Sequence, residues 1–199
     1  MEKNLPNEVT KAIKKINNHD DLSLHEPWFF GNEKKYLNEC IESNYVSTIG
    51  SYVNKFSISI SNFTKSKYVI PVVNGTSALH MAIKIIGVQP NEEILIPSLT
   101  FVATANAVVY NNAIPHFIDI DEKTYNISVE KLREKLVNAK RTNRLPKIII
   151  PVHYAGQSCN MSQIKELSEE FNFNIIEDGS HAIGGKYLNE NIGCCRFSD

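Results

Sequence analysis

The chain has 199 residues, of which 42% are hydrophobic and 22% are charged, and its formal net charge is −1. This composition is typical of a globular protein with a sizeable core, and the near-neutral charge favours neither nucleic acid nor an anionic membrane as partner. The apolar runs are too short to span a bilayer, and the first residues lack the apolar core of a secretory signal. We therefore expect a cytoplasmic protein without a nucleic-acid or membrane partner.

Four cysteines are present, at positions 40, 159, 194 and 195. They form no Cys-x-x-Cys pair, and the adjacent residues Cys194 and Cys195 are poorly placed for an ordinary disulfide. We predict reduced thiols, as is usual in the cytosol, and no metal. The alternative is a zinc site built from Cys194, Cys195 and a distant histidine.

Three helices are predicted before residue 64, because apolar side chains recur there at helical spacing. They cover residues 7–17, 33–43 and 52–63. The first follows Pro6 and carries Val9, Ile13 and Ile16 on one stripe. The stripes of the other two are interpreted as core contacts: Tyr36, Leu37, Cys40 and Ile41 in the second helix, and Val53, Phe56, Ile60 and Phe63 in the third.

From residue 68 onward, predicted strands alternate with predicted helices. The strands cover residues 68–73, 93–96, 114–118, 147–152 and 174–177. The helices cover residues 77–86, 100–110, 128–137 and 161–171, with Gly87 as a left-handed stop and Ser128 as an N-cap. This alternation predicts right-handed βαβ units, a mostly parallel sheet and an α/β fold.

The segment Asn-Gly-Thr-Ser at 74–77 links the first predicted strand to its helix. The helix-start amides, the hydroxyls of Thr76 and Ser77 and the positive end of the helix dipole suit a phosphate group. The segment has neither the P-loop pattern nor the Gly-x-Gly-x-x-Gly pattern. A simple capping turn is the alternative interpretation.

Aromatic and polar side chains follow two further predicted strands. Phe101 could lie in the core, or it could offer a stacking face to a flat cofactor at the edge of the sheet. His153 and Tyr154 could line a substrate cleft, or they could satisfy backbone groups of their loop. The sequence leaves both pairs of alternatives open.

Asp178 ends the apolar strand Ile-Ile-Glu-Asp at 175–178. A carboxylate at the carboxyl end of such a strand lies where open α/β sheets bind ligands, although a helix N-cap is the alternative. Together, a phosphate cradle, a stacking ring and a buried acid suit pyridoxal 5′-phosphate (PLP). The acid would keep the pyridine nitrogen protonated, so that the ring can accept electrons.

Four segments resemble the DegT/DnrJ/StrS family of PLP-dependent nucleotide-sugar aminotransferases. They are Asn-Gly-Thr-Ser-Ala-Leu-His at 74–80, Leu-Thr-Phe-Val-Ala-Thr-Ala-Asn-Ala at 99–107, Pro-Val-His-Tyr-Ala-Gly-Gln at 151–157 and Glu-Asp-Gly-Ser-His-Ala-Ile-Gly at 177–184. The resemblance implies the type I PLP-transferase fold, whose large domain is a three-layer α/β/α sandwich. It also implies that residues 24–199 are an incomplete PLP-binding large domain, after an N-terminal helical extension at 1–23.

The resemblance also assigns roles to individual residues. Thr76 and Ser77 would bind the cofactor phosphate, and Phe101 would stack on the pyridine ring. Asp178 would pair with the ring nitrogen, while His181, the catalytic candidate, would lie near the phenolic oxygen of the ring. The loop that ends at Gly50 resembles the family's substrate-facing N-terminal loop, and His153 and Tyr154 are the other substrate-binding candidates.

Within the family, the sequence resembles enzymes that aminate UDP-4-keto-6-deoxy-N-acetylhexosamines on routes to bacterial nonulosonic acids or bacillosamine. The N-terminal part, including Leu-His-Glu-Pro at 24–27, is similar to the legionaminic or bacillosamine branch. The segments at 153–157 and 180–181 are similar to the pseudaminic acid branch. Glutamate as amino donor and a homodimer of the full-length protein are further implications.

The family's Schiff-base lysine is expected in a Phe-Ser-Phe-His-x-x-Lys-like segment beyond Phe-Ser-Asp at 197–199, and Lys147 and Lys186 do not match its position. The chain thus resembles the N-terminal portion of such an enzyme and is expected to be inactive alone. One alternative is a PLP-dependent sugar dehydratase of the same family, in which a histidine replaces that lysine. Another is a non-catalytic module that binds a phosphate ligand.

Overall fold

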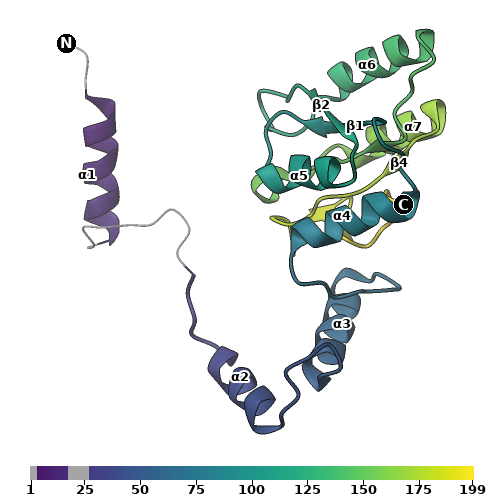
Figure 1. The fold of residues 1–199 in the computed structure, drawn as a ribbon. Helices are drawn as coiled ribbons and strands as arrows, with labels where there is room; N and C mark the ends of the chain where they lie inside the picture. Colours follow the sequence, from purple (N-terminus) through teal and green to yellow (C-terminus); the bar gives the residue numbers. More distant parts are fainter. Residues whose placement is uncertain (1–3, 18–26) are drawn as a thin grey trace. The chain divides into compact units, whose positions relative to one another are not determined.

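The computed structural model describes residues 4–17 and 27–199 (Figure 1). The chain divides into two compact units, Met1–Ser47 and Thr48–Asp199, each of which is described by itself. The expected boundary between residues 23 and 24 lies outside the described residues, as do three of the four residues of the segment at 24–27. Over the described ranges, no helix has the length and apolar character that crossing a membrane requires.

The first unit contains helices α1 (Leu5–Asn17) and α2 (Glu33–Glu42), which confirms both predicted helices. The interpretation of the α2 stripe as core contacts is wrong, because no residue of α2 is buried and Leu37 and Ile41 are largely exposed. A helix buries its apolar stripe only when another apolar layer covers it. The described part of this unit provides no such layer for α2.

The second unit begins with α3 (Ser51–Thr64), also at the predicted position. Its stripe was expected in the core, but Phe56 and Phe63 are about half exposed and Thr64 is the buried residue of the helix. The end of α3 is tied to the C-terminal part of the chain, where the Asn191 side chain donates a hydrogen bond to the Phe63 carbonyl at 2.6 Å.

A four-stranded parallel sheet forms the centre of the second unit. Its strands are β1 (Glu93–Pro97), β2 (Ile114–Ile118), β3 (Ile148–Ile149) and β4 (Asn174–Ile175), in the spatial order β2-β1-β3-β4. Leu95 pairs with Ile149, which in turn pairs with Ile175. Beyond the regular ladder, an isolated parallel bridge joins Val152 to Asp178. The predicted parallel α/β sheet is confirmed.

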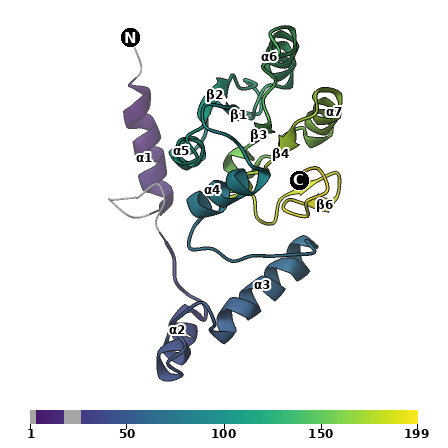
Figure 2. The same ribbon diagram turned by 45° about the vertical axis from the view of Figure 1, so that its right-hand side comes forward.

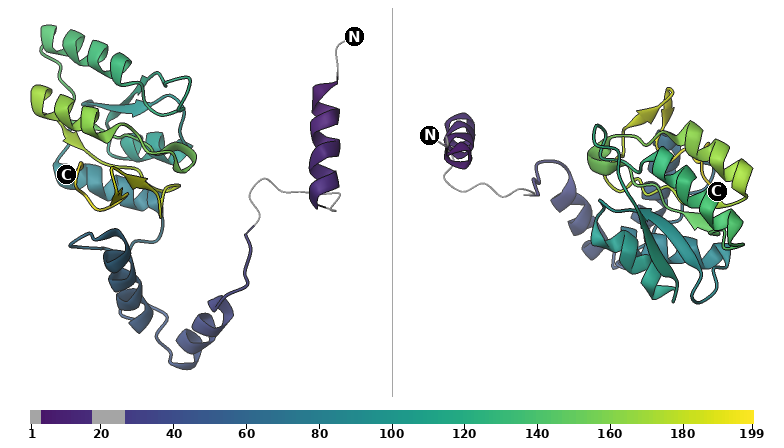
Figure 3. Two further views of the ribbon diagram at one scale, coloured as in Figure 1. Left: turned by 180° about the vertical axis from the view of Figure 1, so that it is seen from behind. Right: turned by 90° about the horizontal axis from the view of Figure 1, so that it is seen from above.

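Helices cover both faces of this sheet, giving three layers (Figures 2 and 3). Helices α4 (Gly75–Ile86) and α5 (Val102–Tyr110) pack on one face, and α6 (Val129–Arg141) and α7 (Met161–Phe171) pack on the other. Because side chains alternate along a strand, Ile94 and Ile96 join the cluster under α4 and α5, whereas Leu95 joins the cluster under α6 and α7.

Two predicted helix-end signals, Gly87 and Ser128, are confirmed. Gly87 follows α4 in the left-handed conformation with φ of 80°. The Ser128 side chain accepts a hydrogen bond from the Lys131 backbone N–H, which caps α6. These local signals mark the end of α4 and the start of α6.

Residues 68–73, predicted as a strand, form none in the structure. Tyr68, Ile70 and Val73 are exposed there. A strand needs a neighbour that accepts and donates backbone hydrogen bonds, and the described part of the chain places no strand beside this segment.

The structure contains an antiparallel pair that the sequence does not predict. Strand β5 (Lys186–Tyr187) pairs with β6 (Glu190–Asn191), and the chain turns between them through Leu188 and Asn189. Both turn residues have positive φ, as a type I′ hairpin requires.

Two isoleucines of α4 provide a matched test of this packing. Ile83 is fully buried beneath the sheet, whereas Ile85 is 76% exposed. We expect Ile83→Ala to lower the free energy of unfolding by about 2–5 kcal/mol through lost burial and a cavity. Ile85→Ala should change it by less than about 0.5 kcal/mol. Urea unfolding followed by circular dichroism measures both, and equal losses would contradict the assigned packing.

Candidate cofactor site

Asp178 lies just beyond β4, at the carboxyl edge of the sheet. The residue is 6% exposed, so that its charge needs partners within the protein. The Thr104 hydroxyl donates to one carboxylate oxygen at 2.9 Å, and the Ser180 hydroxyl donates to the other at 2.7 Å. The Ser180 backbone N–H adds a hydrogen bond at 3.2 Å. These donors hold the carboxylate in one orientation.

This carboxylate forms part of the wall of a cavity of about 310 Å³. Segments from four regions of the chain line it: the start of α4, the start of α5, the segment after β3 and the segment after β4. Its side chains include those of Thr76, Phe101, Thr104, Tyr154, Asp178 and His181. In an open parallel sheet, this edge is where ligands bind.

Residues 74–77, at the start of α4, are interpreted from the sequence either as a phosphate cradle or as a simple capping turn. Asn74 caps the helix, because its side-chain oxygen accepts a hydrogen bond from the Ser77 N–H at 2.9 Å. The amides of Gly75 and Thr76 precede that of Ser77 and have no acceptor within the helix. A Cβ atom at Gly75 would lie 3.3 Å from the Ser180 hydroxyl, so a side chain there would intrude on the cavity wall. The capping turn is therefore present, and the Gly75 and Thr76 amides are the donors that a phosphate at the helix start would use.

The structure brings most of the predicted site residues together. Five of them line the cavity: Thr76, Phe101, Tyr154, Asp178 and His181. Three do not: Gly50, Ser77 and His153. Gly50 is buried immediately before α3, and the Ser77 backbone N–H is bound by the Asn74 cap.

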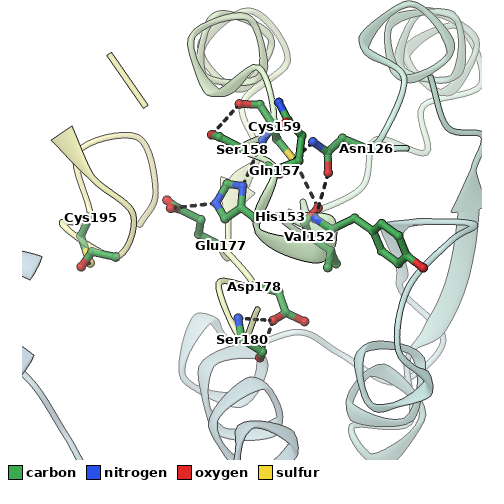
Figure 4. A network of polar contacts seen from close by, with 12 residues as sticks. Asn126, Val152, His153, Gln157, Ser158, Cys159, Glu177, Asp178, Ser180 and Cys195 are labelled. Carbon is green, nitrogen blue, oxygen red and sulfur yellow. Dashed lines mark hydrogen bonds and ion pairs between the residues drawn. The ribbon is translucent and has the colours of Figure 1, made fainter. Parts of the chain in front are cut away.

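His153 occupies a buried position that does not suit substrate contact. Its ring is fully buried, and Nδ1 accepts a hydrogen bond from the Cys159 backbone N–H at 3.0 Å. The ring proton must then lie on Nε2, which donates to Glu177 at 3.0 Å. Glu177 points toward His153, whereas Asp178 points away from it toward Ser180 (Figure 4). The expectation that His153 lines a substrate cleft is therefore replaced by its alternative, the satisfaction of loop backbone groups.

Two groups in this buried region have shifted pKa values. Burial disfavours the charged form of Glu177, but hydrogen bonds from His153, Ser198 and the Gly193 N–H outweigh it, so its pKa lies below the ordinary value. Burial, reinforced by the nearby Glu177 charge, raises the pKa of the Cys159 thiol to about 12. Cys159 is thus a neutral packing residue, because a reactive cysteine requires a thiolate.

Sequence reasoning missed three residues that shape the site. Thr104 and Ser180 lie inside the quoted motifs but were not recognised as the partners of Asp178. Asn126, buried in the connection between β2 and α6, binds the loop that carries Tyr154. The Asp178–Ser180 contact is a local turn that the Asp-Gly-Ser sequence allows. No local pattern indicates the other pairings, because they join segments that are far apart in the chain.

No lysine is among the cavity-lining residues of the described part of the chain. Lys147 donates to the Gly87 carbonyl at 2.7 Å, and Lys186 lies in β5. The zinc alternative finds no support, since the described residues contain no cluster of three or more potential ligands. All four cysteines are free thiols in the structure, as predicted.

A parallel three-layer α/β domain with an acid, an aromatic ring and a helix start around one cavity defines a PLP-binding domain of the aminotransferase type. The chain belongs to the DegT/DnrJ/EryC1/StrS aminotransferase family, which it matches over residues 30–197. The enzymes of this family depend on PLP.

Individual relatives agree with this assignment. The chain is 36% identical over 172 residues to a GDP-perosamine synthase of Escherichia coli O157:H7, covering 86% of this chain and 46% of that protein. A crystal structure of a DegT/DnrJ/EryC1/StrS aminotransferase from Brucella abortus superposes with a TM-score of 0.77 at 32% identity, covering 80% of this chain and 43% of the other. The chain therefore spans less than half the length of these relatives.

The cavity residues fit the cofactor chemically. PLP carries a phosphate, a flat ring and a basic ring nitrogen, for which the chain offers the Gly75 and Thr76 amides, Phe101 and Asp178. The missing Cβ of Gly75 leaves the space that a phosphate at the helix start requires. Asp178 lines the cavity, and the Thr104 and Ser180 hydroxyls hold its carboxylate there.

The lowered pKa of Glu177 predicts an acid-sensitive contribution to stability. A carboxyl group whose pKa is depressed by folding stabilises the protein above its ordinary pKa of 4.5, and this contribution is lost as the pH falls through the lower, folded-state value. We expect the Glu177→Gln variant to show a smaller loss of unfolding free energy below pH 4.5 than the unmodified chain. Glu166→Gln, a change at an exposed glutamate of α7, is the matched control and should leave the profile unaltered. Identical profiles for Glu177→Gln and the unmodified chain would contradict the assigned interaction.

The raised pKa of Cys159 predicts selective alkylation. At pH about 8, iodoacetamide should modify the exposed Cys195 and leave Cys159 unmodified until the chain is unfolded with guanidinium. Mass spectrometry of proteolytic peptides identifies the modified residue. Rapid labelling of Cys159 in the folded chain would show that its thiol is neither buried nor neutral.

Proposed function

We propose that this chain forms the PLP-binding part of an aminotransferase that places an amino group on a nucleotide-linked keto sugar. The proposed acceptor is a UDP-4-keto-6-deoxy-N-acetylhexosamine, and the proposed donor is glutamate, within bacterial surface-polysaccharide or nonulosonic acid biosynthesis. A homodimer of the whole protein is part of the same proposal. The membership of the family and the Asp178 environment support it.

The buried Asp178 carboxylate is the observation that carries the proposal. When bound, PLP supplies an electron sink that allows an amino group to be exchanged for a carbonyl oxygen. The Asp178 carboxylate would accept a hydrogen bond from the protonated ring nitrogen. The hydroxyls of Thr104 and Ser180 hold the carboxylate in place for this contact. A buried, oriented acid stabilises the protonated nitrogen more than a hydrated one would.

The other cavity residues would bind and orient the cofactor. Phe101 offers an exposed aromatic face for stacking, and Thr76 with the start of α4 offers donors to a phosphate. Ser77 can contribute only its hydroxyl, because its N–H is bound to Asn74. His181, at the cavity wall, is proposed to contact the ring beside its phenolic oxygen.

The substrate class rests on the relatives. Besides GDP-perosamine synthase, the chain is 34% identical to the spore coat polysaccharide biosynthesis protein SpsC of Bacillus subtilis. At 26% identity it superposes on the Helicobacter pylori aminotransferase PseC, described as involved in pseudaminic acid biosynthesis, with a TM-score of 0.77. Tyr154 lines the cavity and is the proposed substrate-facing residue, while the role of Gly50 stays a prediction.

No catalytic lysine candidate reaches the cavity in the described part of the chain, so we propose that residues 1–199 alone bind PLP without catalysing amino transfer. The histidine-dependent dehydratase has no specific support from the structure. A lysine at the Schiff-base position would indicate amino transfer and a histidine there would indicate dehydration, and no lysine is among the described residues that line the cavity.

Two adjacent carboxylates allow a matched test of the proposed site. Asp178→Asn should raise the dissociation constant for PLP about tenfold, since a charge-assisted hydrogen bond is lost. Glu177→Gln changes the adjacent acid, which binds His153 and does not line the cavity. This variant should change the dissociation constant for PLP by less than about twofold. Equilibrium dialysis against PLP measures both. Equal affinities for Asp178→Asn and the unmodified chain, or no PLP binding at all, would refute the proposed function.

A further inference from the structure

The loop that carries Tyr154 has an unusual backbone. It forms a short 3-10 turn, Tyr154–Gly156, directly after the buried end of the strand region at Val152. Ala155 has φ of 49° and Gly156 has φ of 86°, and the first of these is unfavourable for a residue with a Cβ atom. Such a conformation persists only when the surrounding structure restrains it.

Asn126 provides that restraint from another connection of the sheet. Its side chain is 3% exposed and makes hydrogen bonds to both ends of the turn. Oδ1 accepts from the Tyr154 backbone N–H at 3.0 Å. Nδ2 donates to the Gln157 carbonyl at 2.9 Å (Figure 4). Because one partner can only donate and the other can only accept, the orientation of the amide is fixed.

The segment that presents Asn126 is itself well fixed. An antiparallel bridge joins Ile120 to Ile127, and the Asp121 N–H donates to the Asn126 carbonyl at 2.8 Å. The Asp121 carboxylate accepts hydrogen bonds from the backbone N–H groups of Lys123 and Thr124 at 3.0 and 2.9 Å. Asn126 thus extends from a closed, internally bonded loop.

We infer that Asn126 is a positioning residue for the candidate site: it fixes the backbone at 154–157 and thereby holds the Tyr154 side chain in the cavity wall. His153 secures the far end of the same loop through the Cys159 N–H. Asn126 does not line the cavity itself, so that its effect on a ligand must pass through Tyr154. The inference that this affects a cofactor or substrate rests on the proposed function.

Hydrogen exchange tests the restraint without any ligand. In Asn126→Ala, the Tyr154 amide should exchange at least about tenfold faster relative to core amides such as that of Ile164, because its acceptor is lost. Asn138→Ala, at an exposed asparagine of α6, is the control and should leave this ratio unchanged. An unchanged ratio in Asn126→Ala would overturn the inference whether or not the chain binds PLP.

A second variant covers the case in which Asn126→Ala does not fold. Asn126→Asp keeps an oxygen that accepts from the Tyr154 N–H and removes the donor to Gln157. The Tyr154 amide should remain protected in this variant. Loss of its protection to the level of exposed amides, with the core amides still protected, would contradict the assigned hydrogen bond.

A double-mutant cycle tests whether Asn126 acts through Tyr154. Asn126→Ala should raise the dissociation constant for PLP several-fold, and the same change should have no further effect in a Tyr154→Ala background. Additive effects of the two changes would overturn the coupling. Failure of the unmodified chain to bind PLP would refute the proposed function instead, while the exchange ratio would still decide the role of Asn126.

Discussion

The burial of one carboxylate is the constraint on which this site depends. Because Asp178 is only 6% exposed, its carboxylate needs hydrogen-bond donors inside the protein. One compensating hydroxyl comes from Thr104 in α5, and the other comes from Ser180 in the turn beyond β4. The start of α5 and the end of β4 therefore have to meet, which requires the parallel pairing of β1, β3 and β4 between them. The strand order of the sheet therefore brings together the residues that form this part of the cavity wall.

Side chains alternate beyond the end of β4, so the adjacent acids Glu177 and Asp178 point to opposite sides of the chain. Asp178 faces the cavity, whereas Glu177 binds His153 on the other side of the chain. His153 and Asn126 then hold the loop whose tyrosine forms another part of the cavity wall. Buried polar groups that are fully hydrogen-bonded specify one arrangement, because any alternative would leave some of them unsatisfied. The wall of the cavity is thus supported from the opposite face of the sheet.

Most of the fold could be predicted from the sequence, because it depends on local signals. The four strands of the parallel sheet and the helices were located by periodicity, by caps such as Ser128 and by the stop at Gly87. The exceptions share a cause. Residues 68–73 have the composition of a strand, but the described part of the chain places no strand beside them. The apolar stripes of α2 and α3 are predicted to be buried, yet no residue of α2 is buried and Phe56 and Phe63 of α3 are about half exposed. Composition predicts the capacity to be buried, whereas burial requires a partner.

By itself, the sequence determined the order of the helices and of the four parallel strands, the family, and most of the residues that line the cavity at the carboxyl edge of the sheet. It could not decide between a capping turn and an anion cradle at 74–77, nor between a cleft and a loop support for His153. Only the tertiary structure paired Asp178 with Thr104, placed His153 outside the cavity wall and identified Asn126. The reason is physical: a side chain's role depends on which hydrogen-bond partners surround it, and most of these partners come from distant parts of the chain.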